Sequence, residues 1–136
     1  MKTAVLLAAS ILAGCATMSG DPEPRGHPCD TDNCVVTVTV KGCNAISVDR
    51  PLVVFDAGKK GDLEWNLVAP GNWSFVDAVE FKNSASNSEF QNKRHGRKKV
   101  KLNNKHTRPG RHPYNVVVTP DNGATRCVLD PTIMNK

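Results

Sequence analysis

The amino-acid sequence predicts an all-β fold, a sandwich of about seven to eight short strands. Several segments rich in Val, Thr and aromatic residues alternate apolar with polar side chains, which is typical of half-buried strands. These segments recur at intervals of roughly ten residues, with Gly and Pro between them. No window of about a dozen residues after Cys15 shows the period of an amphipathic helix.

The alternation is clearest in residues 34–41 (CVVTVTVK), which place one Cys and three Val on the same face. Residues 63–68 (LEWNLV) in the same way place Leu63, Trp65 and Leu67 together. Turn-forming segments such as DAGKKGD, APGN and PDNG separate the apolar runs. The expected strands are residues 34–41, 51–55, 63–68, 73–76, 78–81, 98–102, 114–119 and 124–129, with a polar loop at 82–88.

The order of core positions resembles that of small exported bacterial β-sandwiches with immunoglobulin-like or cupredoxin-like topology, many of them without an assigned function. The resemblance covers most of residues 34–135, and because its motifs are core positions it implies the fold and no mechanism. The positions are Trp65-x-Leu67, Trp73-x-Phe75, Val79-x-Phe81, Tyr114-x-Val116 and the closing Asp130-Pro131-x-Ile133-x-Asn135.

The first fourteen residues, MKTAVLLAASILAG, are expected to be a signal peptide, because one positive residue precedes an apolar run too short to span a bilayer. The run ends in LAGC, Leu12 to Cys15, which resembles the lipobox of bacterial lipoproteins. The resemblance implies cleavage before Cys15, a diacylglyceryl thioether on its sulfur and acylation of the new amino terminus, with palmitate-type chains. The alternative is an ordinary signal peptide followed by a chance cysteine.

Several acyl chains would hold the protein firmly on its leaflet, because each buried methylene contributes about 0.8 kcal/mol. The residue after Cys15 is Ala16 rather than Asp. Lipoproteins resembling this one in enteric-type bacteria are usually forwarded to the outer membrane, so we expect an anchor there that faces the periplasm.

The expected organisation has three parts: a lipoprotein signal peptide (1–14), the lipidated Cys15 with a flexible tether (15–28), and a β-sandwich domain (29–136). The tether contains three Pro and two Gly and has no hydrophobic period. At about 3.1 Å per residue, a Pro-stiffened tether would reach roughly 40 Å.

Four cysteines remain after Cys15, an even number in an oxidising compartment, which favours two disulfides with three possible pairings. The pairing that we favour joins Cys29 to Cys34 and Cys43 to Cys127. A bridge between Cys43 and Cys127 would close a long loop and stabilise the fold by about 4 to 5 kcal/mol. Zinc is disfavoured, because no CxxC pair occurs.

A strongly basic segment runs from Asn92 to His112 and contains no acid, so the rest of the chain is net acidic although the whole carries +5. Such segregation favours docking to an anionic partner, namely lipopolysaccharide, peptidoglycan, phospholipid headgroups or an acidic envelope protein. Nucleic acid is not expected, because no aromatic side chain interrupts the run to stack on a base. The nine candidate anion-binding residues are Lys93, Arg94, Arg97, Lys98, Lys99, Lys101, Lys105, Arg108 and Arg111.

The same segment has a purely structural interpretation. In residues 98–102 (KKVKL), Val100 and Leu102 would face the core while Lys99 and Lys101 point outward, as in edge strands that are charged to prevent aggregation. The flanking residues would then be loops with solvated charges.

No metal, cofactor or catalytic residue is expected. A blue-copper site needs a late Cys followed by His and Met, and Cys127 is followed by VLDPTIM without His. The histidines of the basic segment have cationic neighbours, and no GxSxG motif occurs. Carboxylate pairs such as Asp62 with Glu64 lie beside turn residues, where we expect them to be solvated.

Two hypotheses about function remain. The first is a non-catalytic, tethered binding or scaffold module whose basic segment docks an anionic envelope component. The alternative is an envelope inhibitor of a cell-wall-active enzyme, similar in size and anchoring to lipoprotein inhibitors of lysozyme. Because lysozymes are commonly cationic, a basic partner would repel them, and the first hypothesis is favoured.

Overall fold

The computed structural model of the protein describes residues 24–29, 32–77 and 79–136, and only the backbone of residues 92 and 93. The predicted signal peptide, Cys15 and most of the predicted tether lie outside the described residues. Within them the chain forms twelve strands and one short helix. They are β1 (His27–Pro28), β2 (Asn33–Gly42), β3 (Ala45–Val48), β4 (Leu52–Phe55), β5 (Gly61–Val68), β6 (Ser74–Phe75), β7 (Glu80–Phe81), α1 (Ser84–Glu89), β8 (Phe90–His95), β9 (Lys99–Asn104), β10 (Gly110–Thr119), β11 (Cys127–Leu129) and β12 (Thr132–Asn135).

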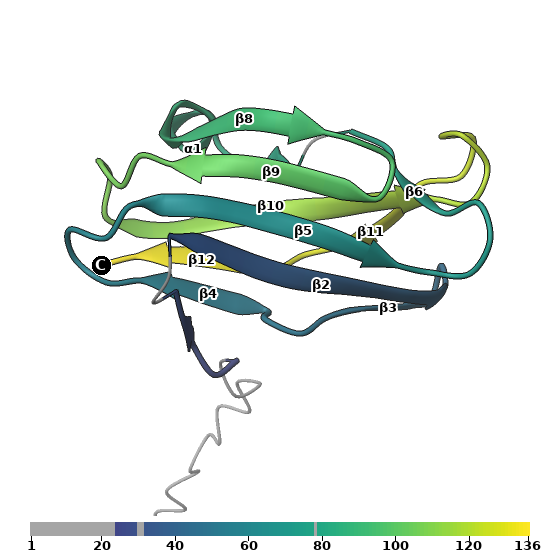
Figure 1. Ribbon diagram of the computed structural model, residues 1–136, viewed down its shortest axis with the longest axis horizontal. Coiled ribbons are helices and arrows are strands. Elements are labelled where there is room, and N and C mark those ends of the chain that lie inside the picture. Colours follow the sequence, from purple (N-terminus) through teal and green to yellow (C-terminus); the bar gives the residue numbers. More distant parts are fainter. Residues whose placement is uncertain (1–23, 30–31, 78) are drawn as a thin grey trace, which may run out of the picture.

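Two mixed sheets pack face to face, so the predicted all-β sandwich is confirmed (Figure 1). One sheet has the order β3-β2-β5-β9-β8. The other has the order β1-β4-β12-β10-β11, and β6 and β7 also pair with β10. β2 runs parallel to β5, and β4 runs parallel to β12, because the chain crosses between the sheets before returning. The resemblance to immunoglobulin-like or cupredoxin-like proteins stays a prediction.

The core lies between the sheets and is built from inward-facing residues of both, and the alternating residues of β2 and β5 take part in it as the sequence predicts. Leu63 and Trp65 have no exposed surface, and Leu67 is also buried. The Trp65 indole donates a hydrogen bond of 3.1 Å to the Tyr114 hydroxyl of the opposite sheet, and the two rings meet edge to face. Burial raises the pKa of the Tyr114 hydroxyl.

The strand count and two boundaries differ from the sequence prediction. β3, β8 and β12 were not expected, and α1 forms over most of the expected polar loop at 82–88. β11 begins at Cys127, three residues after the expected start. Asn83 caps α1, because its side-chain oxygen accepts a hydrogen bond from the Ser86 backbone N–H at 2.8 Å. β10 begins at Gly110, well before the expected start, and so extends into the basic segment.

The prediction that residues 98–102 form a charged edge strand is wrong about the edge. β9 lies inside its sheet, between β5 and β8, and β8 is the edge strand. The inward direction of Val100 and Leu102 is confirmed, since both are buried. The outward Lys side chains of β9 face acidic side chains of β5, which explains why this strand is charged without being an edge.

Both disulfides have the predicted pairing. The short disulfide joins Cys29 to Cys34 with a Cα–Cα distance of 5.6 Å, and the long disulfide joins Cys43 to Cys127 at 5.2 Å. The long disulfide ties the hairpin end of β2 to β11 across the two sheets.

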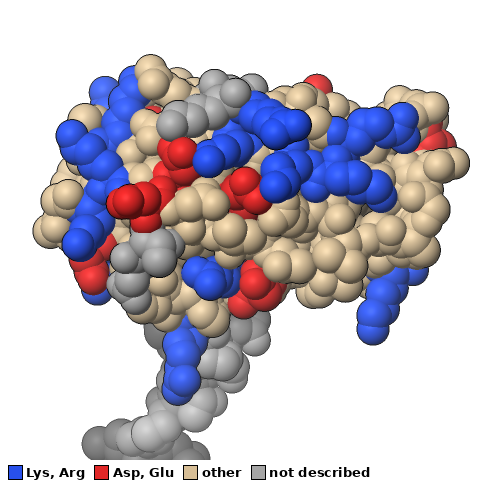
Figure 2. Space-filling model, viewed as in Figure 1, with Lys and Arg blue, Asp and Glu red and all other residues tan. Residues whose placement is uncertain are grey.

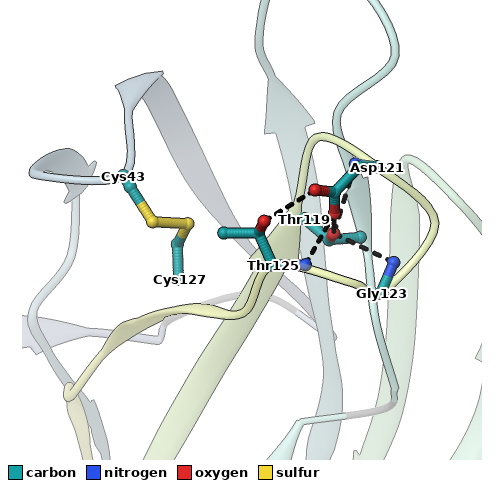
Figure 3. The surroundings of a disulfide bond; sticks show 6 residues. All are labelled: Cys43, Thr119, Asp121, Gly123, Thr125 and Cys127. Carbon is teal, nitrogen blue, oxygen red and sulfur yellow. Dashed lines mark hydrogen bonds between the residues drawn. A yellow bond between two sulfur atoms is a disulfide. The ribbon is translucent and has the colours of Figure 1, made fainter.

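The turn before β11 is ordered by its own side chains (Figure 3). The Asp121 carboxylate accepts hydrogen bonds from the backbone and hydroxyl of Thr125 and from the Thr119 hydroxyl. These bonds, led by that from the Thr125 hydroxyl, lower the pKa of Asp121. Asn122 has a positive φ of 58°, which asparagine tolerates better than most residues. The turn therefore presents β11 to Cys43 in a fixed position.

The N-terminal segment joins the fold earlier than the sequence suggests. His27 and Pro28, assigned to the tether, form β1 and pair with Val53 and Val54 of β4. The Cys29 backbone N–H donates to the Val54 carbonyl at 2.8 Å. In Figure 1 the dark segment that contains β1 lies beneath β4, and β8 lies at the opposite, upper side of the sandwich.

Candidate functional site

The nine predicted anion-binding residues do not form one continuous surface. Two of them, on the outer face of β9, are paired with acids of the neighbouring β5. Lys99 is 2.8 Å from Glu64, and Lys101 is 3.2 Å from Asp62. The hydrogen bond from Lys99 holds the pKa of Glu64 below its ordinary value. These two lysines therefore neutralise the sheet face and add little attraction for an external anion.

A first group of cations lies around the turn between β8 and β9, and we call Arg94, Arg97 and Lys98 the hairpin patch. All three side chains are exposed. Among the described residues, Arg94 and Lys98 have no acidic partner, and Arg97 makes only a long hydrogen bond of 3.5 Å to the Asn72 carbonyl. The side chain of the fourth candidate here, Lys93, lies outside the described part.

A second group of cations lies at the other end of β9, in the loop that leads to β10. Lys105 donates to the Ser88 carbonyl at 2.8 Å, and Arg108 and Arg111 are exposed. The six residues of β9 separate this group from the hairpin patch by roughly 20 Å. Figure 2 shows Lys and Arg gathered toward both ends of this face, with acidic side chains between them.

A hollow of about 420 Å³ opens beside the second group, and we call it the end pocket. One wall comes from Asn83, Ala85 and Ser86 of the α1 segment. The opposite wall comes from the β9–β10 loop and the start of β10, namely Thr107, Arg108, Pro109, Arg111 and His112. The pocket therefore joins segments that are about twenty residues apart in the sequence.

A buried carboxylate, Glu89, supports the loop wall of this pocket from inside. Glu89 is 1% exposed and accepts hydrogen bonds from the Thr107 N–H and hydroxyl, both at 2.6 Å, and from the Arg108 N–H at 3.3 Å. Burial alone would raise the pKa of Glu89, but these hydrogen bonds outweigh it, so the pKa lies below its ordinary value. Glu89 is thus an ionised group that orders the loop.

Two buried asparagines extend the network to the opposite sheet. Asn104 of β9 and Asn135 of β12 exchange side-chain hydrogen bonds of 2.8 and 3.2 Å. Asn135 also donates to Glu89 at 3.4 Å and to the Arg108 carbonyl at 3.3 Å. Buried polar groups are stable only when they are paired, so these contacts fix the loop relative to both sheets.

A Ser–His pair closes the back of the pocket. The Ser86 hydroxyl lies 2.8 Å from His112 Nδ1, and His112 Nε2 lies 3.1 Å from the Arg108 carbonyl. Ser86 has no exposed surface, and the second ring nitrogen faces a backbone carbonyl instead of a carboxylate. The pair therefore lacks the accessible nucleophile and the orienting acid of a hydrolytic triad, and it acts as a structural wall.

Arg126 and His106 also have structural partners. Arg126 lies 2.7 Å from Glu80 and 3.4 Å from Asp77. The His106 ring contacts the carbonyls of Lys59 and Lys136. Within the described parts of the chain, no group of three or more His, Cys, Asp and Glu is placed to hold a metal ion. No helix there is both long and apolar enough to cross a membrane.

The sequence predicted the exposed Lys and Arg of the basic segment but not the buried residues that fix the β9–β10 loop in place. The contacts of Glu89 with Thr107 and of Ser86 with His112 join segments that are distant in the sequence, and no local sequence pattern predicts them. One signal was available: an Asn before SASNSE is a typical N-cap, and it could have predicted α1.

No protein-family model matches the chain, and no curated protein resembles it closely enough to count as a relative.

Proposed function

We propose that the protein is a lipid-anchored module of the bacterial envelope that binds peptidoglycan through the hairpin patch without catalysing a reaction. The observation that carries this proposal is the contrast between two sets of cations. Lys99 and Lys101 are paired with acids, whereas Arg94 and Lys98 are exposed without an acidic partner among the described residues. Unpaired exposed cations are the ones available to an external anion.

The position of the patch favours peptidoglycan over the other anionic partners. The chain enters the fold through β1, beneath β4, and β8 lies on the opposite side of the sandwich (Figure 1). If lipids on Cys15 hold the protein to the periplasmic leaflet of the outer membrane, an entry at β1 places the hairpin on the side of the domain away from its tether, free to reach into the periplasm. Peptidoglycan lies in that direction, and lipopolysaccharide lies on the far side of the membrane.

The chemistry of the patch fits the carboxylates of peptidoglycan. Each Lys or Arg near an anionic surface contributes about 1 kcal/mol, and this attraction is screened over about 8 Å at physiological ionic strength. Three such side chains give weak, salt-sensitive binding at one site. Repeated carboxylates on a polymer would strengthen it through multivalency when several copies of the protein share one membrane.

The test is co-sedimentation of the mature chain, produced without its lipid, with purified peptidoglycan sacculi over a salt series. The test variant combines Arg94→Glu with Lys98→Glu. Its matched control combines Lys59→Glu with Lys60→Glu, which reverses the same number of charges in the exposed turn after β4. We expect the wild type and the control to pellet with sacculi at low salt and the test variant to stay in solution.

Equal loss in both double variants would mean that net charge alone drives the interaction, and the hairpin patch would be rejected as a site. Binding to lipopolysaccharide vesicles without binding to sacculi would reject peptidoglycan as the partner. Inhibition of lysis of a cell-wall suspension by the purified protein would favour the alternative, an inhibitor of a cell-wall-active enzyme.

A further inference from the structure

The end pocket lies about 20 Å from the hairpin patch and has a different chemistry. We propose that it binds a carboxylate group on a small apolar substituent, either a free small molecule or the end of a peptide chain. Arg108 and Asn83 would hold the carboxylate. This inference concerns a second site and does not depend on the hairpin patch.

Among the described residues, Asn83 and Arg108 leave side-chain donors free at the pocket, whereas the Asn83 side-chain acceptor is occupied. The Asn83 side-chain oxygen already accepts from the N–H and hydroxyl of Ser86, at 2.8 and 2.7 Å. Its amide Nδ2 and the Arg108 guanidinium have no partner among the described residues. A pocket that offers N–H donors and a positive charge, but no free carboxylate, selects an anion.

The backbone of Arg108 is held far more rigidly than that of a typical surface arginine. Its N–H donates to the buried Glu89, and its carbonyl lies within hydrogen-bonding distance of His112 Nε2 and Asn135 Nδ2. Three buried side chains thus fix one exposed residue at the wall of a pocket. Such preorganisation reduces the entropy lost on binding and is typical of recognition sites.

The local charge favours a singly charged ligand. Arg108 and Arg111 face the pocket, while the ionised Glu89 lies behind the loop. A planar carboxylate matches the fork of one guanidinium and carries one negative charge. A phosphate dianion would need more donors, and its second negative charge would increase the repulsion by the ionised Glu89.

The volume of the pocket and its apolar surfaces limit the size of the apolar group that the bound carboxylate can carry. The volume of about 420 Å³ is at the small end of the range for ligand sites. Ala85 and Pro109 provide short apolar surfaces on opposite walls. A methyl-sized side chain beside the carboxylate would contact them.

The test uses amide chemical shifts of the isotopically labelled full chain in nonionic detergent. The probes are N-acetylalanine, its uncharged analogue N-acetylalaninamide, acetate and inorganic phosphate. We expect N-acetylalanine to shift the amides of Thr107 and Arg108 with saturation and N-acetylalaninamide to leave them unchanged. Tighter binding of N-acetylalanine than of acetate would indicate a chain end, and equal binding would indicate a free small carboxylate.

Two variants remove the proposed contacts, and one matched variant does not. Arg108→Gln should weaken binding of N-acetylalanine by about 10- to 100-fold, the effect of losing one charge-assisted hydrogen-bonded contact. Asn83→Asp keeps the oxygen that caps α1 and replaces the free donor with a negative charge, so it should weaken binding at least as much. Arg25→Gln removes an exposed guanidinium that belongs to neither proposed site and should leave binding unchanged.

Three results would overturn the proposal: no saturable shift with N-acetylalanine, equal binding of its amide, or tighter binding of phosphate. The variants also separate the two sites. Arg108→Gln should still pellet with sacculi, and the variant with Arg94→Glu and Lys98→Glu should still bind N-acetylalanine. Failure at one site therefore leaves the other testable.

Discussion

Replacing Glu89 by Gln tests the buried network that holds the β9–β10 loop. The carboxylate accepts two hydrogen bonds of 2.6 Å from Thr107 and longer ones from Arg108 and Asn135. The change is nearly isosteric, but it turns one acceptor oxygen into a donor that faces other donors. The perturbation is therefore electrostatic and not a change in packing volume.

The magnitude follows from the contacts. A hydrogen bond to a charged group contributes about 1.5–3 kcal/mol, and a buried donor left unpaired costs about 1–3 kcal/mol. Glu89→Gln keeps one acceptor, so we expect the free energy of unfolding to fall by about 3–4 kcal/mol. With a urea slope of about 1.5–2 kcal/mol per molar, the unfolding midpoint should fall by about 2 M.

The assay is urea unfolding followed by tryptophan fluorescence, with both disulfides intact. The matched control is Glu64→Gln on the outer face of β5, which loses only its contacts with Lys99 and Asn66 and should cost less than about 1 kcal/mol. A loss below about 1 kcal/mol for Glu89→Gln, or an equal loss in both variants, would refute the reasoning.

Acid provides a second check on the same residue. Because the folded-state pKa of Glu89 lies below its ordinary value of 4.5, its ionised form stabilises the fold above that pH. The contribution is lost as the pH falls through the lowered folded-state pKa. The difference in unfolding free energy between wild type and Glu89→Gln should therefore be constant near neutral pH and shrink on acidification below 4.5.

Three further predictions concern other parts of the molecule. Removing the long disulfide by Cys43→Ala with Cys127→Ala should lower the free energy of unfolding in urea by about 4 to 5 kcal/mol. Removing the short disulfide should lower it by about 2 kcal/mol, because that bridge closes a much shorter loop. Equal losses would contradict this prediction. Tyr114→Phe should cost about 1–2 kcal/mol in the same assay, because it leaves the buried Trp65 N–H without an acceptor, and an unchanged stability would argue against this bond. Cys15→Ser should abolish palmitate labelling and move the protein from the membrane to the soluble fraction of the envelope, and retention in the membrane would reject lipid anchoring.

The sequence predicted the inner faces of the sheets well, because burial there imposes a strict period. Every second residue of β2 is buried, and Leu63, Trp65 and Leu67 follow the same rule. β8 was not predicted, because among its described side chains only Phe90 is part of the apolar core, and an edge strand with a polar sequence has no such period.

The position of β9 could not be read from its own lysines alone. The lysines of β9 suggested an edge, but they form ion pairs with Glu64 and Asp62 of β5. The complementary pattern of acids on one strand and bases on another was in the sequence, and it would have placed the two strands side by side. The end pocket was beyond prediction, because its walls meet only after both sheets have formed.

The most direct test of the proposed function maps where peptidoglycan touches the protein. Amide chemical shifts of the labelled mature chain, produced without its lipid, would be recorded while soluble peptidoglycan fragments are added. We predict that the largest shifts fall at Arg94, Arg97 and Lys98, decrease with added salt and vanish in the variant with Arg94→Glu and Lys98→Glu. Shifts that avoid the hairpin patch, or that persist in this variant, would contradict the account.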